Sequence, residues 1–158
     1  MKLAAANYRA AARTRLDEAR CLYGGRFWAG ATYLAGRGAE AILRGLLALR
    51  EPRLESGHDL RDLLARVRRT GMLRERNDAE LENAVNEVAV VWRNNLRFAD
   101  DDLFRWLLRQ QKRDRSIGRT PVKGEPEKAN AKSVLEACER IISRGDLLWK
   151  RLQSNSEK

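Results

Sequence analysis

Apolar residues recur every three or four positions along most of the chain, which is the spacing of one face of an amphipathic α-helix. The clearest example is near the N-terminus, where the line consists of Tyr8, Ala12, Leu16, Ala19 and Tyr23. No segment alternates apolar and polar residues as a strand does, and no internal repeat is present. The pattern therefore predicts an all-α chain.

Glycines, prolines and helix-capping residues divide this pattern into segments. The predicted helices run up to Gly24–Gly25, from about Phe27 to Leu49, from Gly57–Leu60 to Gly71, from Asn77 to about Phe98, from Leu103 to about Lys112, and from about Ala129 to Leu152. Their mostly short connections favour antiparallel neighbours. We expect an antiparallel up-down helical bundle of four main helices plus short extra helices.

The bundle is predicted to be a single domain over residues 1–153, followed by a disordered tail at 154–158. Residues 113–128 hold two prolines and two glycines and few apolar residues, so they predict a mobile basic loop. The second helix is crowded with small residues, although glycine weakens a helix by about 0.5–1 kcal/mol relative to alanine. These small residues indicate close approach by another backbone, from this chain or from a second copy.

The composition is that of a globular domain, since 43% of the 158 residues are hydrophobic and 34% are charged. No apolar run has the length of a membrane-spanning helix, and the N-terminus lacks the apolar core of a signal peptide. We therefore expect a cytoplasmic protein without a membrane association.

The residues that usually bind metals are scarce. Cys21 and Cys138 lie far apart, and His58 is the single histidine, which excludes a cysteine–histidine zinc site and a disulfide framework. Both cysteines have apolar neighbours and are predicted to be buried and reduced. No glycine-rich phosphate-binding motif is present, and we expect neither a metal nor a cofactor.

The net charge of +10 is unevenly distributed. Residues 1–50 carry 9 basic and 3 acidic side chains, residues 51–102 carry 9 and 12, and residues 103–158 carry 14 and 7. Such a charge favours a polyanionic partner such as RNA. The excess of arginine over lysine, 25 to 7, is also what the codon usage of a GC-rich genome produces, so both interpretations stay open.

The densest basic stretch runs from Arg105 to Lys123 with Asp114 as its single acid. An arm of this kind can neutralise phosphates and release their counterions. The alternative is a solvated helix face followed by a loop. Trp106 could stack on an unpaired base, although we expect it to pack in the core. With Arg97, the candidate nucleic-acid-binding residues are Arg105, Arg109, Lys112, Arg113, Arg115 and Arg119.

Three segments in this order resemble the HEPN superfamily. They are the small-residue helix GRFWAGATYLAGRGAEAILRGLL, the following GHDLRDLL, and a helix ending VVWRNNLRF that precedes the long final helix AKSVLEACERIISRGDLL. The resemblance covers residues 5–152. It implies a helical bundle that commonly forms a homodimer. Many HEPN proteins are metal-independent ribonucleases of toxin–antitoxin or phage-defence systems, and others bind RNA, nucleotides or a partner such as a nucleotidyltransferase.

The ribonuclease motif of that superfamily is an arginine, often followed by a polar residue, with a histidine four to six residues further on. Arg93 and Asn94 match its first half, but the positions where the histidine is expected are occupied by Phe98, Ala99 and Asp100. Cleavage through the 2′-hydroxyl needs a group that moves a proton, which histidine does near neutral pH. Arginine stays protonated and can only stabilise the phosphorane.

His58 could replace the missing histidine only if the fold brought it to Arg93. The HEPN resemblance implies a structural role for its Gly-His-Asp-Leu turn. Arg93 has a structural interpretation too, as the partner of Asp100 or Asp101 in an ion pair. Three hypotheses remain. The chain is a degenerate HEPN protein that binds RNA or another polyanion, an active ribonuclease toxin with a non-standard base, or a non-catalytic subunit that binds a nucleotidyltransferase, an antitoxin or a defence enzyme.

Overall fold

The computed structural model describes residues 3–51, 57–73 and 78–156. Helices occupy most of this part of the chain, which confirms the predicted all-α class. They are α1 (Ala5–Gly24), α2 (Trp28–Ala48), α3 (Leu60–Arg69), α4 (Asp78–Val91), the 3₁₀ helix η2 (Asn94–Phe98), α5 (Asp101–Gln110) and α6 (Pro126–Ser156), with two short strands, β1 (Ser116–Ile117) and β2 (Thr120–Pro121).

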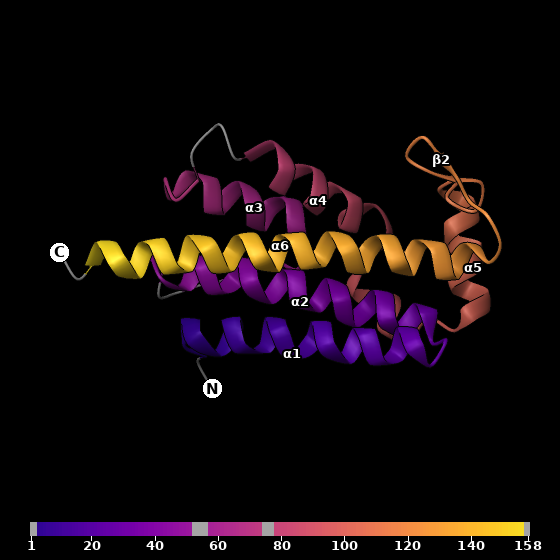
Figure 1. Cartoon of the computed structure of the whole chain (residues 1–158), viewed down its shortest axis with the longest axis horizontal. Helices are drawn as coiled ribbons and strands as arrows, with labels where there is room; N and C mark the ends of the chain where they lie inside the picture. The colour runs from indigo at the N-terminus through magenta and orange to yellow at the C-terminus, as the bar shows by residue number, and fades with distance from the viewer. Residues whose placement is uncertain (1–2, 52–56, 74–77, 157–158) are drawn as a thin grey trace.

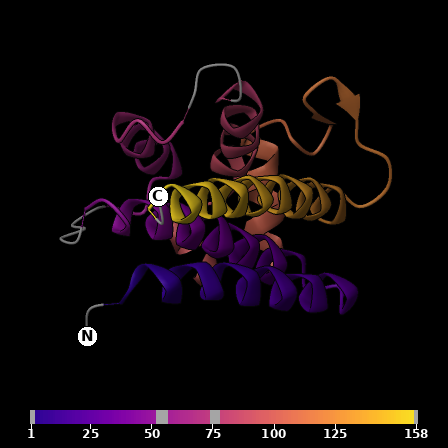
Figure 2. The ribbon, with the colours of Figure 1, turned by 60° about the vertical axis from the view of Figure 1, so that its left-hand side comes forward.

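The long helices α1, α2 and α6 lie along one another, α4 packs on the side of α6 that faces away from α1, and α3 packs against α2 and α4 (Figure 1). α1 and α2 run in opposite directions, and so do α4 and α6. The second view shows α2 enclosed between α1 and the remaining helices (Figure 2). α5 and the β1–β2 hairpin lie across one end of the bundle, opposite the C-terminus.

The small residues of α2 permit the close approach that the sequence predicts, and the approaching backbone is that of α1. A Cβ added to Gly38 would lie 2.9 Å from the carbonyl oxygen of Ala12, and one added to Gly45 would lie 3.3 Å from that of Ala5. Any larger side chain at these positions would push α1 away from α2. Glycine therefore sets the spacing between the first two helices.

Trp92 ends the fourth helix earlier than its apolar stripe predicts. Its indole lies against Gly36, where an added Cβ would come within 2.1 Å of the ring, and its Nε1–H donates to the carbonyl of Tyr33 at 3.0 Å. These contacts hold the chain against α2, so α4 stops at Val91 and Arg93 is extended, with φ −137° and ψ 149°. The prediction of a helix to Phe98 was wrong, since a 3₁₀ helix occupies residues 94–98.

The segment 113–128 is more regular than the predicted loop. β1 and β2 pair antiparallel with Ser116 opposite Pro121, and Gly118 adopts a left-handed φ of 59° in the turn. α6 begins at Pro126, where proline fits because the first helical N–H groups need no intrahelical acceptor. The same helix continues to Ser156, so the predicted disordered tail is helical over residues 154–156.

Two helix starts follow their sequence signals. The Asp59 side chain accepts hydrogen bonds from the amides of Arg61 and Asp62 at the start of α3, and Asp100 accepts one from the amide of Leu103 at the start of α5. The capping residue predicted for α4, Asn77, lies outside the described residues. None of the described helices is long and apolar enough to cross a bilayer.

Only one of the two cysteines is buried as predicted. Cys138 is fully enclosed by α6 and its neighbours, and this burial raises the pKa of its thiol. Cys21 is exposed, because α1 packs on the bundle through Ala12, Leu16 and Ala19 and the position of Cys21 falls outside that face. The prediction for Cys21 was therefore wrong.

We predict that Gly36→Ala lowers the free energy of unfolding by about 1–3 kcal/mol, because the new methyl group displaces the Trp92 ring. The better helix propensity of alanine, worth about 0.5–1 kcal/mol, offsets only part of this loss. Urea unfolding followed by circular dichroism measures the change. Gly24→Ala is the matched control, since nothing lies within 4 Å of its added Cβ. Equal stability of the two variants would contradict the placement of Trp92.

Candidate functional site

Glu40 is a buried carboxylate on the middle of α2, with 3% of its side chain exposed. Its Oε2 accepts a hydrogen bond from Arg37 at 2.5 Å, and its Oε1 accepts one from Arg44 Nε at 2.7 Å. The spacing of three and four residues on one helix brings both guanidinium groups to the same face. A buried carboxylate needs such partners, because removing its charge from water is otherwise costly.

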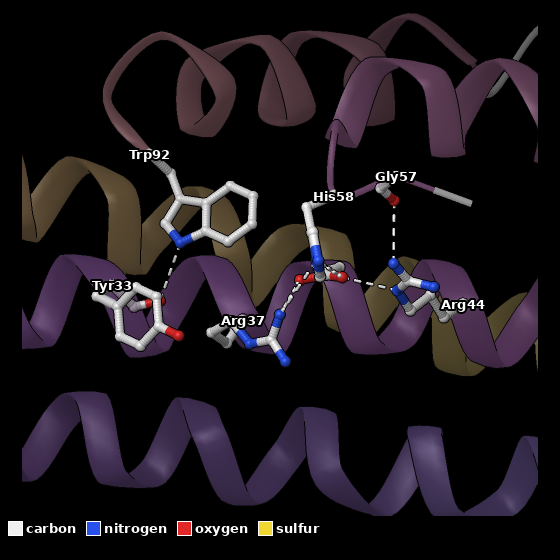
Figure 3. Close-up of polar contacts among 7 residues, drawn as sticks. Tyr33, Arg37, Arg44, Gly57, His58 and Trp92 are labelled. Atoms are coloured by element: carbon white, nitrogen blue, oxygen red, sulfur yellow. Dashed lines mark hydrogen bonds and ion pairs between the residues drawn. The ribbon is translucent and has the colours of Figure 1, made fainter. Parts of the chain in front are cut away.

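The single histidine completes this cluster. His58 Nδ1 lies 2.8 Å from Glu40 Oε1, and Arg44 also donates to the carbonyl of Gly57 at 3.0 Å (Figure 3). The segment before α3 is thus tied to α2 through two contacts. This arrangement agrees with a structural role for the Gly-His-Asp-Leu turn. It also leaves the imidazole side chain about half exposed to solvent.

The fold brings His58 to the same pocket as Arg93, which was the condition for any catalytic role of this histidine. The pocket has a volume of about 190 Å³ and is lined by His58, Asp59, Leu60, Ala89, Trp92, Arg93 and Asn94. It forms because Trp92 places the end of α4 against α2, beside the start of α3. An imidazole, a guanidinium and an amide that share one pocket could bind a phosphate group.

Arg93 itself is held by backbone groups. Its Nη1 donates to the carbonyls of Ala89 and Trp92, at the C-terminal end of α4. A cation at the C-terminal end of a helix also interacts favourably with the helix dipole. The predicted ion pair with Asp100 or Asp101 is not formed, because the extended backbone at Arg93 leaves its side chain against the end of the preceding helix.

The predicted basic residues divide into two groups. Arg105 forms ion pairs with Glu127 and Asp102, and Arg113 forms one with Glu87, so both are engaged within the fold. In the described part of the chain, the other cations of residues 97–123 have no carboxylate partner. We call this group the basic cap: Arg97, Arg109, Lys112, Arg115, Arg119 and Lys123. It lies on η2, which packs on α2, and on α5 and the hairpin, which lie at the end of the bundle opposite the C-terminus (Figure 1).

Exposed aromatic rings accompany the basic cap. Trp106 is 52% exposed and Phe98 is 75% exposed, so the expectation that Trp106 packs in the core was wrong. α5 packs on the bundle through Phe104 and Leu108, which places Trp106 on a different face of this short helix. The guanidinium of Arg97 lies 4.6 Å from the centroid of the Phe98 ring, within the range of a cation–π contact.

Arg113 anchors the hairpin in the bundle and is 7% exposed. Lys112 has a left-handed φ of 56°, which turns the chain inward directly after α5. Arg113 then donates to Asn130 Oδ1 at 2.6 Å and to Glu87, while Asn130 Nδ2 donates back to the Arg113 carbonyl. The group therefore joins α4, α6 and the start of the hairpin segment.

Glu87 is the acidic centre of this second cluster, and Ser133 also donates to its Oε1. Partial burial raises the pKa of Glu87, but the hydrogen bonds from Arg113 and Ser133 and the charges of Arg113 and Arg140 outweigh burial. Together they hold this pKa below the usual value for a glutamate. The ionised carboxylate is thus the form that the fold stabilises.

Sequence reasoning missed both clustered carboxylates, the buried Glu40 and the partly buried Glu87. Glu40 had a usable signal, since it is the single acid in a helix otherwise rich in small apolar residues and has arginines three residues before it and four after it. Glu87 had no such signal, because its partners come from distant segments. Among the described residues, no group of three histidine, cysteine or acidic side chains could bind a metal ion.

Comparison with known proteins agrees with the HEPN resemblance of the sequence. The family model described as "HEPN domain" matches residues 5–147. Two solved structures have similar folds. ST0689, an archaeal HEPN homologue, has a TM-score of 0.57 at 16% identity, with 91% of this chain and 96% of that chain covered. TT1696 from Thermus thermophilus has a TM-score of 0.56 at 21% identity, covering 91% and 97%. No curated protein matches the chain.

Glu87→Gln is predicted to lower the free energy of unfolding at pH 7 by about 3 kcal/mol, because it leaves the buried Arg113 without a counter-charge. The pKa of Glu87 is lowered by folding, so its contribution is complete above the unfolded value near 4.5. This contribution is lost as the pH falls through the folded value. Urea unfolding at several pH values should therefore show the difference from the wild type shrinking in acid.

The control for that series is Glu136→Gln, which alters an exposed pair whose Lys132 nitrogen lies 3.9 Å away. We expect a change of about 0.5 kcal/mol or less there. A pH-independent difference for Glu87→Gln would contradict the ionised pair with Arg113.

Proposed function

The chain belongs to the HEPN domain family, and we propose that this member binds single-stranded RNA through the basic cap. The proposal depends on one observation: six cations without carboxylate partners in the described structure lie within residues 97–123, together with two exposed aromatic rings. Unpaired cations are free to neutralise phosphates, and exposed rings can stack on bases that are not already paired.

The contrast with the first two helices supports this assignment. Every arginine of α1 and α2 has a carboxylate partner: Arg9, Arg13, Arg15, Arg20, Arg37 and Arg44. Codon usage would raise the number of arginines along the whole chain, and Arg61 and Arg144 also form no ion pair in the described structure. The five unpaired cations from Arg109 to Lys123, however, are accompanied by a single acid, Asp114. The charge of the basic cap therefore favours a polyanionic ligand.

The buried Arg113 cluster adds a reason to assign binding to this end. It holds the hairpin against α4 and α6, so Arg115 and Arg119 extend from an anchored segment. Anchoring reduces the entropy that is lost when these side chains meet a ligand. The HEPN resemblance makes a homodimer and a toxin–antitoxin or phage-defence setting part of the same proposal, and a second copy would double the number of basic caps.

We predict that Arg115→Ala combined with Arg119→Ala weakens binding to a labelled single-stranded RNA about 25-fold at about 0.1 M salt. Each lost phosphate contact removes about 0.7 from the slope of log affinity against log salt, so the slope falls by about 1.4. Fluorescence anisotropy across a salt series measures both quantities. Lys150→Ala combined with Arg151→Ala is the matched control, since it removes the same charge near the C-terminal end of α6.

Two further measurements complete this experiment. Trp106→Ala should weaken binding to single-stranded RNA about fivefold or more and leave binding to duplex RNA nearly unchanged, because only unpaired bases can stack on the ring. If the Arg115/Arg119 variant and the Lys150/Arg151 control lost RNA affinity equally, the loss would follow from net charge alone and the basic cap would not be the binding site. Absence of RNA binding by the wild type would instead favour the interaction-subunit hypothesis, with Leu103 and Trp106 contacting a partner protein.

A second candidate function, metal-independent RNA cleavage, is favoured by the pocket that His58 shares with Arg93 and Asn94. In that reaction His58 would accept the proton of the 2′-hydroxyl as its oxygen attacks the adjacent phosphorus, and Arg93 would stabilise the phosphorane. The P–O5′ bond would then break, leaving a 2′,3′-cyclic phosphate, and the departing 5′-oxygen would take the proton back from the His58 imidazolium. The contacts of His58 with Glu40 and of Arg93 with carbonyl groups give both residues a structural explanation, so binding remains the first proposal.

We predict that the wild-type protein does not cleave mixed single-stranded and structured RNA in EDTA, because the motif histidine is absent after Arg93. Denaturing gels of the wild type, His58→Asn and Arg93→Ala test this expectation. Cleavage by the wild type that disappears in both variants would establish the second candidate in place of the first. Cleavage that persists in both would indicate a contaminating nuclease.

A further inference from the structure

A groove of about 630 Å³ lies between α1 and α2, away from the basic cap. We propose that it binds a small organic anion, in which an apolar body carries a carboxylate or phosphate group. The volume is in the range of small-molecule sites in proteins. The groove shares no residue with the basic cap, so this proposal stands independently of RNA binding.

The polar end of the groove is built around the buried Glu40. This carboxylate is in contact with two guanidinium groups, so the cluster retains an excess positive charge even with His58 neutral. Arg37 is 36% exposed and uses Nη1 for Glu40, whereas its Nε and Nη2 have no partner in the described structure. Its guanidinium lies between the ribbons of α2 and α1, where a bound anion would sit (Figure 3).

The position of Arg37 is set before any ligand arrives. The bond to a carboxylate that is itself 3% exposed limits the rotamers of the arginine, so less entropy is lost when its remaining N–H groups bind an anion. Guanidinium groups bind carboxylate and phosphate oxygens through paired N–H donors. Arg15, which also lines the groove, forms an ion pair with Glu18 and adds little net charge.

Away from the Glu40 cluster and Arg15 the lining is apolar or aromatic, which disfavours a bare inorganic ion as the best ligand. Tyr8, Leu34, Tyr33 and Ala41 line it and are each only partly buried in the described structure. A ligand with a flat or aliphatic body would cover these side chains while its charged group meets Arg37. A cationic ligand is disfavoured, since both oxygens of Glu40 are already occupied.

The test is a titration of the ¹⁵N-labelled full chain followed by amide chemical shifts. The probes are phenyl phosphate, benzoate, inorganic phosphate and benzyl alcohol. We expect saturable shifts in the facing parts of α1 and α2 with phenyl phosphate or benzoate, and the stronger of these two identifies the preferred anionic group. Inorganic phosphate and benzyl alcohol should each bind at least tenfold more weakly, because each supplies one half of the recognised chemistry.

Arg37→Gln should weaken binding of the preferred probe at least tenfold, whereas Arg50→Gln, the same substitution just beyond α2, should not. Because Arg37→Gln also removes a partner of the buried Glu40, a second variant leaves that cluster intact. Ala11→Phe fills the groove from the α1 side and should abolish binding while the helical circular dichroism is retained. Binding that survives Ala11→Phe, equal affinity for benzyl alcohol, or shifts confined to residues 97–123 would each overturn the proposal.

Discussion

The enclosure of α2 by other helices is the constraint on which the rest of the structure depends. α1, α6, α3 and η2 all pack on it, so its surface has to accommodate neighbours on several sides. Gly38 and Gly45 let the α1 backbone approach, and Gly36 leaves room for the ring of Trp92. That ring determines where α4 ends, and the end of α4 determines where Arg93 and Asn94 lie. The absence of a side chain at Gly36 thus connects helix packing to the candidate site.

A charged residue on such an enclosed helix has to be compensated within the fold. Glu40 is therefore surrounded by Arg37, Arg44 and His58, and the same rule places Arg113 beside Glu87. These clusters show how the excess of arginines is used. Some neutralise buried or surface carboxylates and stabilise the bundle, and others, such as those of the basic cap, form no ion pair in the described structure. Net charge alone does not separate the two uses, whereas the positions of the carboxylates do.

The departure from the HEPN ribonuclease motif also has a structural counterpart. Phe98 is 75% exposed on η2, at one of the positions where the motif places its histidine, and it contacts Arg97. The one histidine of the chain is bound to a carboxylate on α2 and reaches the Arg93 pocket from the segment before α3. The histidine that is missing after Arg93 in the sequence is thus replaced in the pocket by His58 from a distant segment, which contacts Glu40.

The sequence alone determined the helical class, most helix limits, the close approach to α2 and the family resemblance. These features depend on local periodicity, capping residues and side-chain size, which can be seen within a few turns of chain. Only the tertiary structure decided that Arg105 and Arg113 are engaged, that Trp106 and Cys21 are exposed, and that His58 and Arg93 share a pocket. Each of those outcomes depends on which distant segment supplies a neighbour, because burial and ion pairing are properties of packed surfaces and not of sequence spacing.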